Sequence, residues 1–467
     1  MIEDTGIAER ALRLALSLPH VSYAEAYLER LRSVSAAVEQ GEANGAGASE
    51  RFGLRIRVIR RGRLYTISTD KEDIRALDSC LRRMGEFGGK SAVTSLSDER
   101  KENASYSVKE AIPIEDGNPL NELDKAEKRA ASLGFVKYRS FYASLGRSES
   151  YYLNAEGTEI YADVPSFSFF GSIIASVNGE SRQRFLQLGG VGGYEGFEKL
   201  LIDDAVVEEA GRLRNVMEKG VSLPQDKLKR IRNVVASPEI VGIAVHESIG
   251  HANEADRIMG REAAQAGMSY LEVEDAGKRI ASEAVTIIDD PTIKNSYGYY
   301  LYDDEGVKAY GKKIVERGFQ KEFLTNREYA AELGKKSNAS SRSDDYSNEP
   351  IIRMSNTYLK PGRYGPDELM EEARTGVYIR SFMEWNIDDT RSFARYQGNE
   401  AYLIEKGEVS KPVKNYVLEA GTAELWNAVA MVGSDFGLYV GSCGKGEPMQ
   451  GVPVTMGGGS ALLAFGR

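Results

Sequence analysis

His246-Glu247-Ser248-Ile249-Gly250-His251 is the stretch from which the rest of the chain can be interpreted, because it holds two of only three histidines in 467 residues. Two imidazoles can hold a transition-metal ion, and a carboxylate beside them can take a proton from metal-bound water. The stretch therefore predicts a metal centre with His246 and His251 as ligands and Glu247 as the general base.

The spacing of the two histidines predicts a distorted helix. Histidines at i and i+4, the pattern of many zinc hydrolases, lie roughly 40° apart around an α-helix. Here the spacing is i and i+5, which places the two side chains about 140° apart, too far to share one ion. A single π-type turn would absorb the extra residue, and so would a helix that ends at Gly250 in a left-handed conformation. Both solutions predict a break in the regular helix at Gly250.

A helix is expected to lead into this stretch. Ser237 can cap its first turn, and Pro238 suits the first helical position. Apolar residues then recur at helical spacing between residues 240 and 249.

Cys443 is the best candidate for a third ligand, since a catalytic zinc usually has three protein ligands and one open position. It lies in Gly-Ser-Cys-Gly-Lys-Gly, a turn expected after a strand at 436–440. A thiolate and two imidazoles favour zinc, with ferrous iron as the alternative. A reduced, inert cysteine in this turn is the competing interpretation.

The other candidates are weaker. Glu254 could share a helix face with His251, and its position suits the orientation of that histidine better than ligation. His20 is interpreted as a surface or domain-packing residue, and Cys80 as a small core residue of a helix.

Together these motifs resemble those of the TldD/PmbA family of metallopeptidases. The similar stretches are HESIGH, GSC at 441–443 in the G-x-C pattern, RMSNTYLKPG at 353–362, AYLIEKGEVSKPVK at 401–414 and MQGVPV at 449–454. A further similarity from 151 to 193 extends the resemblance to most of the chain.

The resemblance implies that His246, His251 and Cys443 hold zinc and that Glu247 is the general base. PmbA-type subunits, also called TldE, lack the metal motif and pair with a TldD subunit. This chain keeps every catalytic element and so resembles the catalytic TldD branch. Between 384 and 398 it has aspartates and arginines where bacterial TldD chains tend to be richer in glycine, so substrate contacts in this stretch are not carried over from the family.

The function implied is a zinc-dependent peptidase that hydrolyses short or unfolded peptides with a metal-bound water activated by Glu247. The expected assembly is a homodimer or a heterodimer with a PmbA/TldE-type subunit.

Two alternative functions remain. A peptide deformylase-like amidase also combines two histidines, a glutamate and a cysteine, but with i, i+4 spacing. A non-enzymatic subunit with structural zinc would usually close its site with four ligands.

Composition agrees with a soluble cytoplasmic enzyme. Hydrophobic residues make up 42% and charged residues 28%, as in ordinary globular proteins. Two distant cysteines give no disulfide framework. No apolar run reaches the roughly 18 residues of a membrane span, and residues 11–18 do not form a secretory signal. The net charge of −10 argues against a nucleic-acid-binding surface.

The chain is expected to be α+β and multidomain, with mixed and antiparallel sheets. Three parts are predicted: an N-terminal α/β domain at 1–89, a central α+β domain at 90–228 and a strand-rich C-terminal metallopeptidase domain at 229–467. The first contains helices at 7–16 and 70–84 and a half-buried strand at 54–58, with Arg55 and Arg57 on its solvated face. The second contains a helix at 120–131 and a hairpin turn at Asn178-Gly179.

Two polar segments of the third part are also interpreted. The acidic run 303–306 is expected to form a hairpin tip, with a cation or amine site as the weaker alternative. Residues 335–348 are polar enough to form a mobile loop, which we expect near the mouth of the active site.

Overall fold

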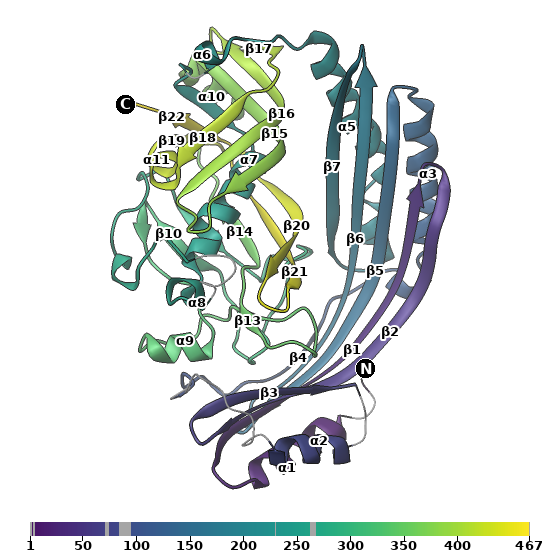
Figure 1. Cartoon of the computed structure of the whole chain (residues 1–467), viewed down its shortest axis with the longest axis vertical. Helices are drawn as coiled ribbons and strands as arrows, with labels where there is room; N and C mark the ends of the chain where they lie inside the picture. Colours follow the sequence, from purple (N-terminus) through teal and green to yellow (C-terminus); the bar gives the residue numbers. More distant parts are fainter. Residues whose placement is uncertain are drawn as a thin grey trace.

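The computed structural model describes residues 2, 5–70, 74–83, 95–228, 230–261 and 268–466. A long curved sheet forms one side of the molecule, and a body of shorter strands and helices lies against it (Figure 1). Most neighbouring strands are antiparallel and a few pairs are parallel. The α+β class with mixed and antiparallel sheets is therefore confirmed.

The long sheet has seven strands in the order β3-β2-β1-β5-β6-β4, with β7 also paired to β6. Its strands are β1 Val21–Glu39, β2 Glu42–Arg60, β3 Arg63–Thr69, β4 Asn103–Ser107, β5 Val136–Asn154, β6 Glu159–Val177 and β7 Glu180–Val191. The turn predicted at Asn178-Gly179 joins β6 to β7, and both of its residues have positive φ. Strands of the first two predicted parts thus share one sheet, and the exact domain boundaries stay a prediction.

Helices cover one face of this sheet. They are α1 Gly6–Ser17, α2 Ile74–Arg83, η2 Ile114–Asp116, α3 Pro119–Ser132, α4 Tyr194–Glu198 and α5 Ile202–Lys219. Alternation along β1 explains the arrangement, because Ala24, Ala26 and Leu28 pack into the core that contains α1, while Ala36 and Val38 pack into the core that contains α3 and α5. The helices predicted at 7–16 and 120–131 are confirmed.

The predicted helix at 70–84 is present as α2, although residues 71–73 and 84 lie outside the described part of the chain. The interpretation of Cys80 as a core residue is wrong, because its side chain is exposed. Leu77 and Leu81 are the buried residues of this helix, and the 3.6-residue period turns Cys80 away from the face that they share.

The opposite face of the sheet packs against the C-terminal body, and this reverses one prediction. Arg55 and Arg57 do alternate with buried apolar residues, but their side chains are only 1% exposed. Arg57 donates Nη1 to Glu25 at 2.8 Å and to Glu305 at 2.7 Å. Glu305 belongs to the acidic turn 303–306, so this turn supplies the partner that buries the arginine.

Residues 335–348 form part of the same contact, and the prediction of a mobile loop is wrong for most of them. Ser341–Arg342 forms the short strand β12, which pairs with β13 Ile351–Ile352. The Tyr346 N–H donates to the Glu29 carboxylate at 2.9 Å. Strand β13 and the long sheet thus both supply partners to this polar segment. The position expected at the active-site mouth stays a prediction.

The C-terminal body contains two further large sheets. The six-stranded sheet has the order β11-β10-β9-β14-β21-β20 and the seven-stranded sheet the order β17-β16-β15-β8-β22-β19, with β18 beside β16. The strands are β8 Asn233–Ala236, β9 Ile287–Asp289, β10 Lys312–Glu316, β11 Phe319–Gln320, β14 Asn356–Leu359, β15 Thr375–Ile387, β16 Phe393–Glu405, β17 Glu408–Pro412, β18 Val417–Gly421, β19 Val429–Val432, β20 Gly437–Lys445, β21 Gln450–Gly458 and β22 Ala461–Ala464. The helix α7 Pro238–Ala244 contacts strands of both sheets.

Shorter helices surround these sheets: α6 Gln225–Leu228, α8 Ala255–Ile258, η5 Val273–Asp275, α9 Arg327–Glu332, α10 Pro366–Ala373 and α11 Thr422–Asn427. One apolar core joins α7, β14, β15 and β21. Within the described ranges, no helix is both long and apolar enough to cross a membrane.

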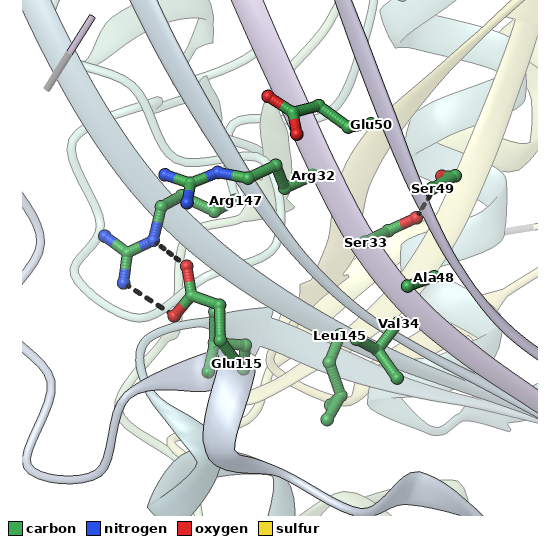
Figure 2. A pocket seen from close by; sticks show the side chains of 10 residues that line it. Arg32, Ser33, Val34, Ala48, Ser49, Glu50, Glu115, Leu145 and Arg147 are labelled. Atoms are coloured by element: carbon green, nitrogen blue, oxygen red, sulfur yellow. Dashed lines mark hydrogen bonds and ion pairs between the residues drawn. The ribbon is translucent and has the colours of Figure 1, made fainter.

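A cavity of about 320 Å³ lies on the helix-covered face of the long sheet (Figure 2). Figure 2 shows Arg147 bonded twice to Glu115 at its rim. Arg32, which also lines the cavity, pairs with Glu149 at 2.9 Å. Both guanidinium groups therefore already have acidic partners.

The buried acids of this interface predict a pH dependence of stability. Burial, with the neighbouring charge of Asp304, raises the pKa of Glu29 from 4.5 to about 7. The folded state therefore holds this proton more tightly, and stability falls as the pH rises from about 4.5 to 7. We expect Glu29→Gln to raise the free energy of unfolding at pH 8 by up to about 3 kcal/mol, with little effect at pH 4.5, measured by urea denaturation.

Glu25→Gln is the matched control with the opposite sign. Burial alone would raise the pKa of Glu25, but Arg57 and Tyr23 hold it below its ordinary value. Its ionised form stabilises the fold above the unfolded pKa, so Glu25→Gln should destabilise the protein at pH 8 and less so as the pH falls. If both variants changed the free energy of unfolding at pH 8 in the same direction, this explanation of the interface would be contradicted.

Candidate metal centre

The distorted helix expected around the two histidines is present. Helix α7 begins with the Ser237 hydroxyl accepting the Ile240 N–H, and Pro238 occupies its first turn. It then passes into a π-helix, η3 Val245–Gly250, and a 3₁₀ turn, η4 His251–Asn253. The wider π turn accommodates the extra residue, so the side chains of His246 and His251 lie on the same side of the helix.

Gly250 contributes through its lack of a side chain. Its φ is −57°, a right-handed value that any residue adopts, so the alternative of a left-handed helix end is not the one used. A Cβ at this position would lie 1.9 Å from Sδ of Met354, which is fully buried. The glycine is needed because the π turn packs directly against Met354.

Three predicted side chains come together at the end of this helix. The ligand atoms of His246, His251 and Cys443 all lie within 4.8 Å of one another, and all three residues are buried. Cys443 Sγ lies 3.4 Å from His251 Nε2. Cys443 is in strand β20, paired with Val452 of β21, rather than in the turn expected from its glycines. The ladder with β21 includes Gly441 and Gly444, and the chain turns only at Gly446, whose φ is +89°.

The donor set fits a transition-metal ion such as zinc. His246 Nδ1 is buried and has no hydrogen-bond partner among the described residues, which leaves it available to an ion. Burial lowers the pKa of His246, which favours the neutral imidazole that ligation needs. Burial would raise the pKa of the Cys443 thiol, but His251 and Arg353 outweigh this effect and lower it. The thiolate form is therefore favoured as well.

Glu254 orients His251, as its spacing suggested. Its Oε2 lies 3.0 Å from His251 Nδ1, which directs Nε2 toward Cys443. Lys445 lies 3.2 Å from the same carboxylate and also donates to Asp256. Burial would raise the pKa of Glu254, but Lys445 and His251 hold it well below its ordinary value. The charged carboxylate fixes the histidine ring.

Two supporting residues were not predicted from the sequence. Lys445 follows Cys443 on β20, and Arg353 donates to the backbone carbonyls of Cys443 and Gln450. Two features of the sequence could have indicated them. Lys445 lies two residues after Cys443, and Arg353 begins the stretch 353–362 that resembles the family. His20, by contrast, is exposed between α1 and β1 and does not join the cluster.

Glu247 lies beside the cluster and has an unexpected partner. Burial raises its pKa, while the charges of His246 and Arg391 partly oppose the shift. Arg391 lies in the connection between β15 and β16. Its Nη1 donates a hydrogen bond to Glu247 Oε2, with 2.6 Å between the two atoms. The carboxylate expected to act as the base is thus buried, close to the histidines and held by an arginine.

Three family models match the chain in sequence. Residues 229–463 match the PmbA/TldA metallopeptidase C-terminal domain, residues 24–86 match its domain 1 and residues 101–217 match its central domain. The chain belongs to the TldD/PmbA family of metallopeptidases. The resemblance inferred from the motifs is confirmed, and the three matches together span most of this TldD/PmbA chain.

Relatives within the family carry corresponding names. A metalloprotease of Methanothermobacter thermautotrophicus is 35% identical over 456 residues, which cover 94% of this chain and 93% of that one. A zinc metalloprotease TldD homolog of Saccharolobus solfataricus is 36% identical over 226 residues, 48% of each chain. These names agree with the TldD branch and with a metallopeptidase.

Solved structures share the whole fold at low sequence identity. TldE from Thermococcus kodakarensis is 18% identical with a TM-score of 0.74, covering 98% of this chain and 100% of that one. A Thermotoga maritima protein described as a modulator of DNA gyrase is also 18% identical with a TM-score of 0.74, covering 98% of each chain. At this identity the similarity shows the fold alone.

The packing at Gly250 gives a direct test of the π turn. We expect Gly250→Ala to lower the melting temperature and the bound zinc per chain, because the new methyl group would overlap Met354 Sδ and shift His251. Gly211→Ala in helix α5 is the matched control, since its Cβ would meet no atom within 4 Å. It should leave zinc content unchanged and stabilise the helix by roughly 0.5–1 kcal/mol. Full zinc occupancy in Gly250→Ala would contradict the packing argument.

Proposed function

We propose that this chain is a zinc-dependent peptidase that hydrolyses peptide bonds in short or unfolded peptides. The observation that carries the proposal is the buried cluster of His246, His251 and Cys443 with the Glu247 carboxylate beside it. A structural zinc site would usually be closed by a fourth protein ligand. Among the described residues, His246, His251 and Cys443 are the side chains that come together here, and Glu254 is engaged with His251 instead.

In the proposed mechanism, His246, His251 and Cys443 would hold the ion. When bound, zinc supplies a positive charge that polarises the scissile carbonyl and lowers the pKa of a nearby water to around 7. Glu247 takes one proton from this water as its oxygen adds to the carbonyl carbon. The same carboxyl group then gives the proton to the nitrogen as the C–N bond breaks, which releases an amine and a carboxylic acid, and the acid passes its proton to the amine. A raised pKa suits both transfers.

The assembly and location remain part of the proposal. Membership of the TldD/PmbA family supports the assembly that we propose, a homodimer or a heterodimer with a TldE-type subunit. Two free cysteines, one exposed and one buried in the cluster, agree with a reducing cytoplasm. A substrate bound in extended conformation suits a body rich in short strands.

Glu247→Gln tests the general base. We expect this variant to keep its zinc and to lose peptide hydrolysis by about 100-fold or more, because an amide cannot accept the proton. The measurements are zinc per chain by atomic emission and the release of amine from a mixture of short peptides. Glu424→Gln, at an exposed position of α11, is the control and should match the native chain. Undiminished hydrolysis in Glu247→Gln would remove Glu247 from the mechanism.

Cys443→Ser tests the third ligand. A hydroxyl is a much poorer zinc ligand than a thiolate, so this variant should lose most of its zinc and the increase in melting temperature that zinc gives the native protein. Cys80→Ser replaces the exposed cysteine and should keep both properties. If the two serine variants bind zinc equally well, Cys443 is not a ligand.

A further inference from the structure

Arg391 contacts the proposed base, and the peptidase mechanism does not use it. It lies in the connection at residues 388–392 between β15 and β16. Its side chain is 13% exposed and ion-pairs with Glu247, the proposed base. A largely buried guanidinium on the proposed base requires a reason, because removing a charge from water costs several kcal/mol.

The connection that carries Arg391 is held firmly in place. The Arg391 N–H bonds to the Asp388 carbonyl at 3.0 Å, and the Asp388 carboxylate accepts from the Phe393 N–H. From neighbouring elements, the Tyr270 N–H donates to the Thr390 carbonyl at 2.8 Å and the Thr422 hydroxyl donates to the Arg391 carbonyl at 2.6 Å. These bonds direct the Arg391 side chain toward Glu247.

The backbone of Arg391 would suit glycine better. Its φ is +66°, in the left-handed region, and it follows a turn closed by the bond to Asp388. This position of a hairpin connection favours glycine, and another residue costs roughly 1–2 kcal/mol there. Surface arginines such as Arg317 also have positive φ, so what distinguishes Arg391 is its contact with Glu247.

Two nitrogens of the Arg391 guanidinium, Nε and Nη2, have no acceptor among the described residues. Nη1 binds Glu247, while Nε is buried without a partner and Nη2 makes no hydrogen bond to a described residue. Nε and Nη2 form the edge of the fork that matches the two oxygens of a carboxylate. Among the other cations around the cluster, Lys445 binds Glu254 and Asp256. Arg353 binds two backbone carbonyls through Nη1 and Nη2, so only its Nε is without a partner.

We propose that Arg391 binds a carboxylate of the peptide substrate through Nε and Nη2 while Nη1 keeps Glu247 in position. Because Arg391 touches the base directly, the recognised carboxylate lies close to the bond that is cleaved. It is either the free C-terminus of a short peptide or the side chain of an adjacent Asp or Glu. Arg391 is then a specificity-determining residue, and this inference rests on the proposed peptidase function.

Matched substrates separate the two sources of the carboxylate. One pair is a short peptide with a free C-terminus and its C-terminal amide. The other pair places Glu or Gln beside the scissile bond in a peptide with an amidated C-terminus. We expect the native zinc enzyme to prefer the acidic member of at least one pair by about 10-fold or more in kcat/KM, because a bidentate charge-assisted contact is lost in the neutral member.

Arg391→Gly removes the guanidinium without straining the backbone, since glycine suits the positive φ at this position. The preference for the acidic peptide should fall to within about 2-fold in this variant, and Arg391→Lys should lie between, because an ammonium lacks the fork. Arg317→Gly is the control. It removes another arginine with positive φ, whose side chain is 72% exposed and pairs with Glu283 at the surface, and it should keep the full preference.

Binding separates this inference from the proposed function. A phosphinic peptide with a free C-terminus, its C-terminal amide and the corresponding Glu and Gln analogues are titrated into the native enzyme and Arg391→Gly by calorimetry. A preference that depends on Arg391 supports the inference even if no peptide is hydrolysed. Hydrolysis with no acidic preference in either pair, or a preference that survives in Arg391→Gly, overturns the inference and leaves the peptidase intact.

Discussion

The extra residue between His246 and His251 is the constraint on which the metal centre depends. A regular helix would separate the two imidazoles, so the chain widens into a π turn that brings their ring centroids to 4.9 Å. This wider turn packs directly against Met354, and any side chain at residue 250 would collide with it. The local geometry of the histidines is therefore tied to the packing of the strand-rich body behind them.

The same body positions the remaining groups of the centre. Cys443 comes from β20, whose register is set by the ladder with β21, and Lys445 follows two residues later on the same strand. Lys445 balances Glu254, and Glu254 holds the ring of His251. The thiolate, the imidazole and its orienting carboxylate thus depend on one sheet and one distorted helix, and a shift of either element would move several of them at once.

The two buried polar regions differ in the partners of their arginine side chains. Between the long sheet and the C-terminal body, Arg57 is enclosed by Glu25 and Glu305, which stabilises the contact between distant parts of the chain. At the metal centre, Arg391 has Glu247 on one side and unused donors on the other. Arg57 also keeps Nε and Nη2 without a partner, but it is enclosed by two carboxylates of the protein, whereas the free edge of Arg391 lies beside the proposed base.

The sequence alone determined the chemistry and the local form of this protein. Two scarce histidines at i and i+5 with a glutamate between them require a distorted helix because the helical angle per residue is constant. Period-two patterns predicted the alternation of β2, and Ser237 and Pro238 predicted the start of α7. Tertiary structure decided which faces are buried, so Arg55 and Arg57 became interior residues when a distant acidic turn covered them. It also brought Arg391 to Glu247 across 144 positions of sequence, a contact that no local pattern encodes because it depends on how separate sheets pack.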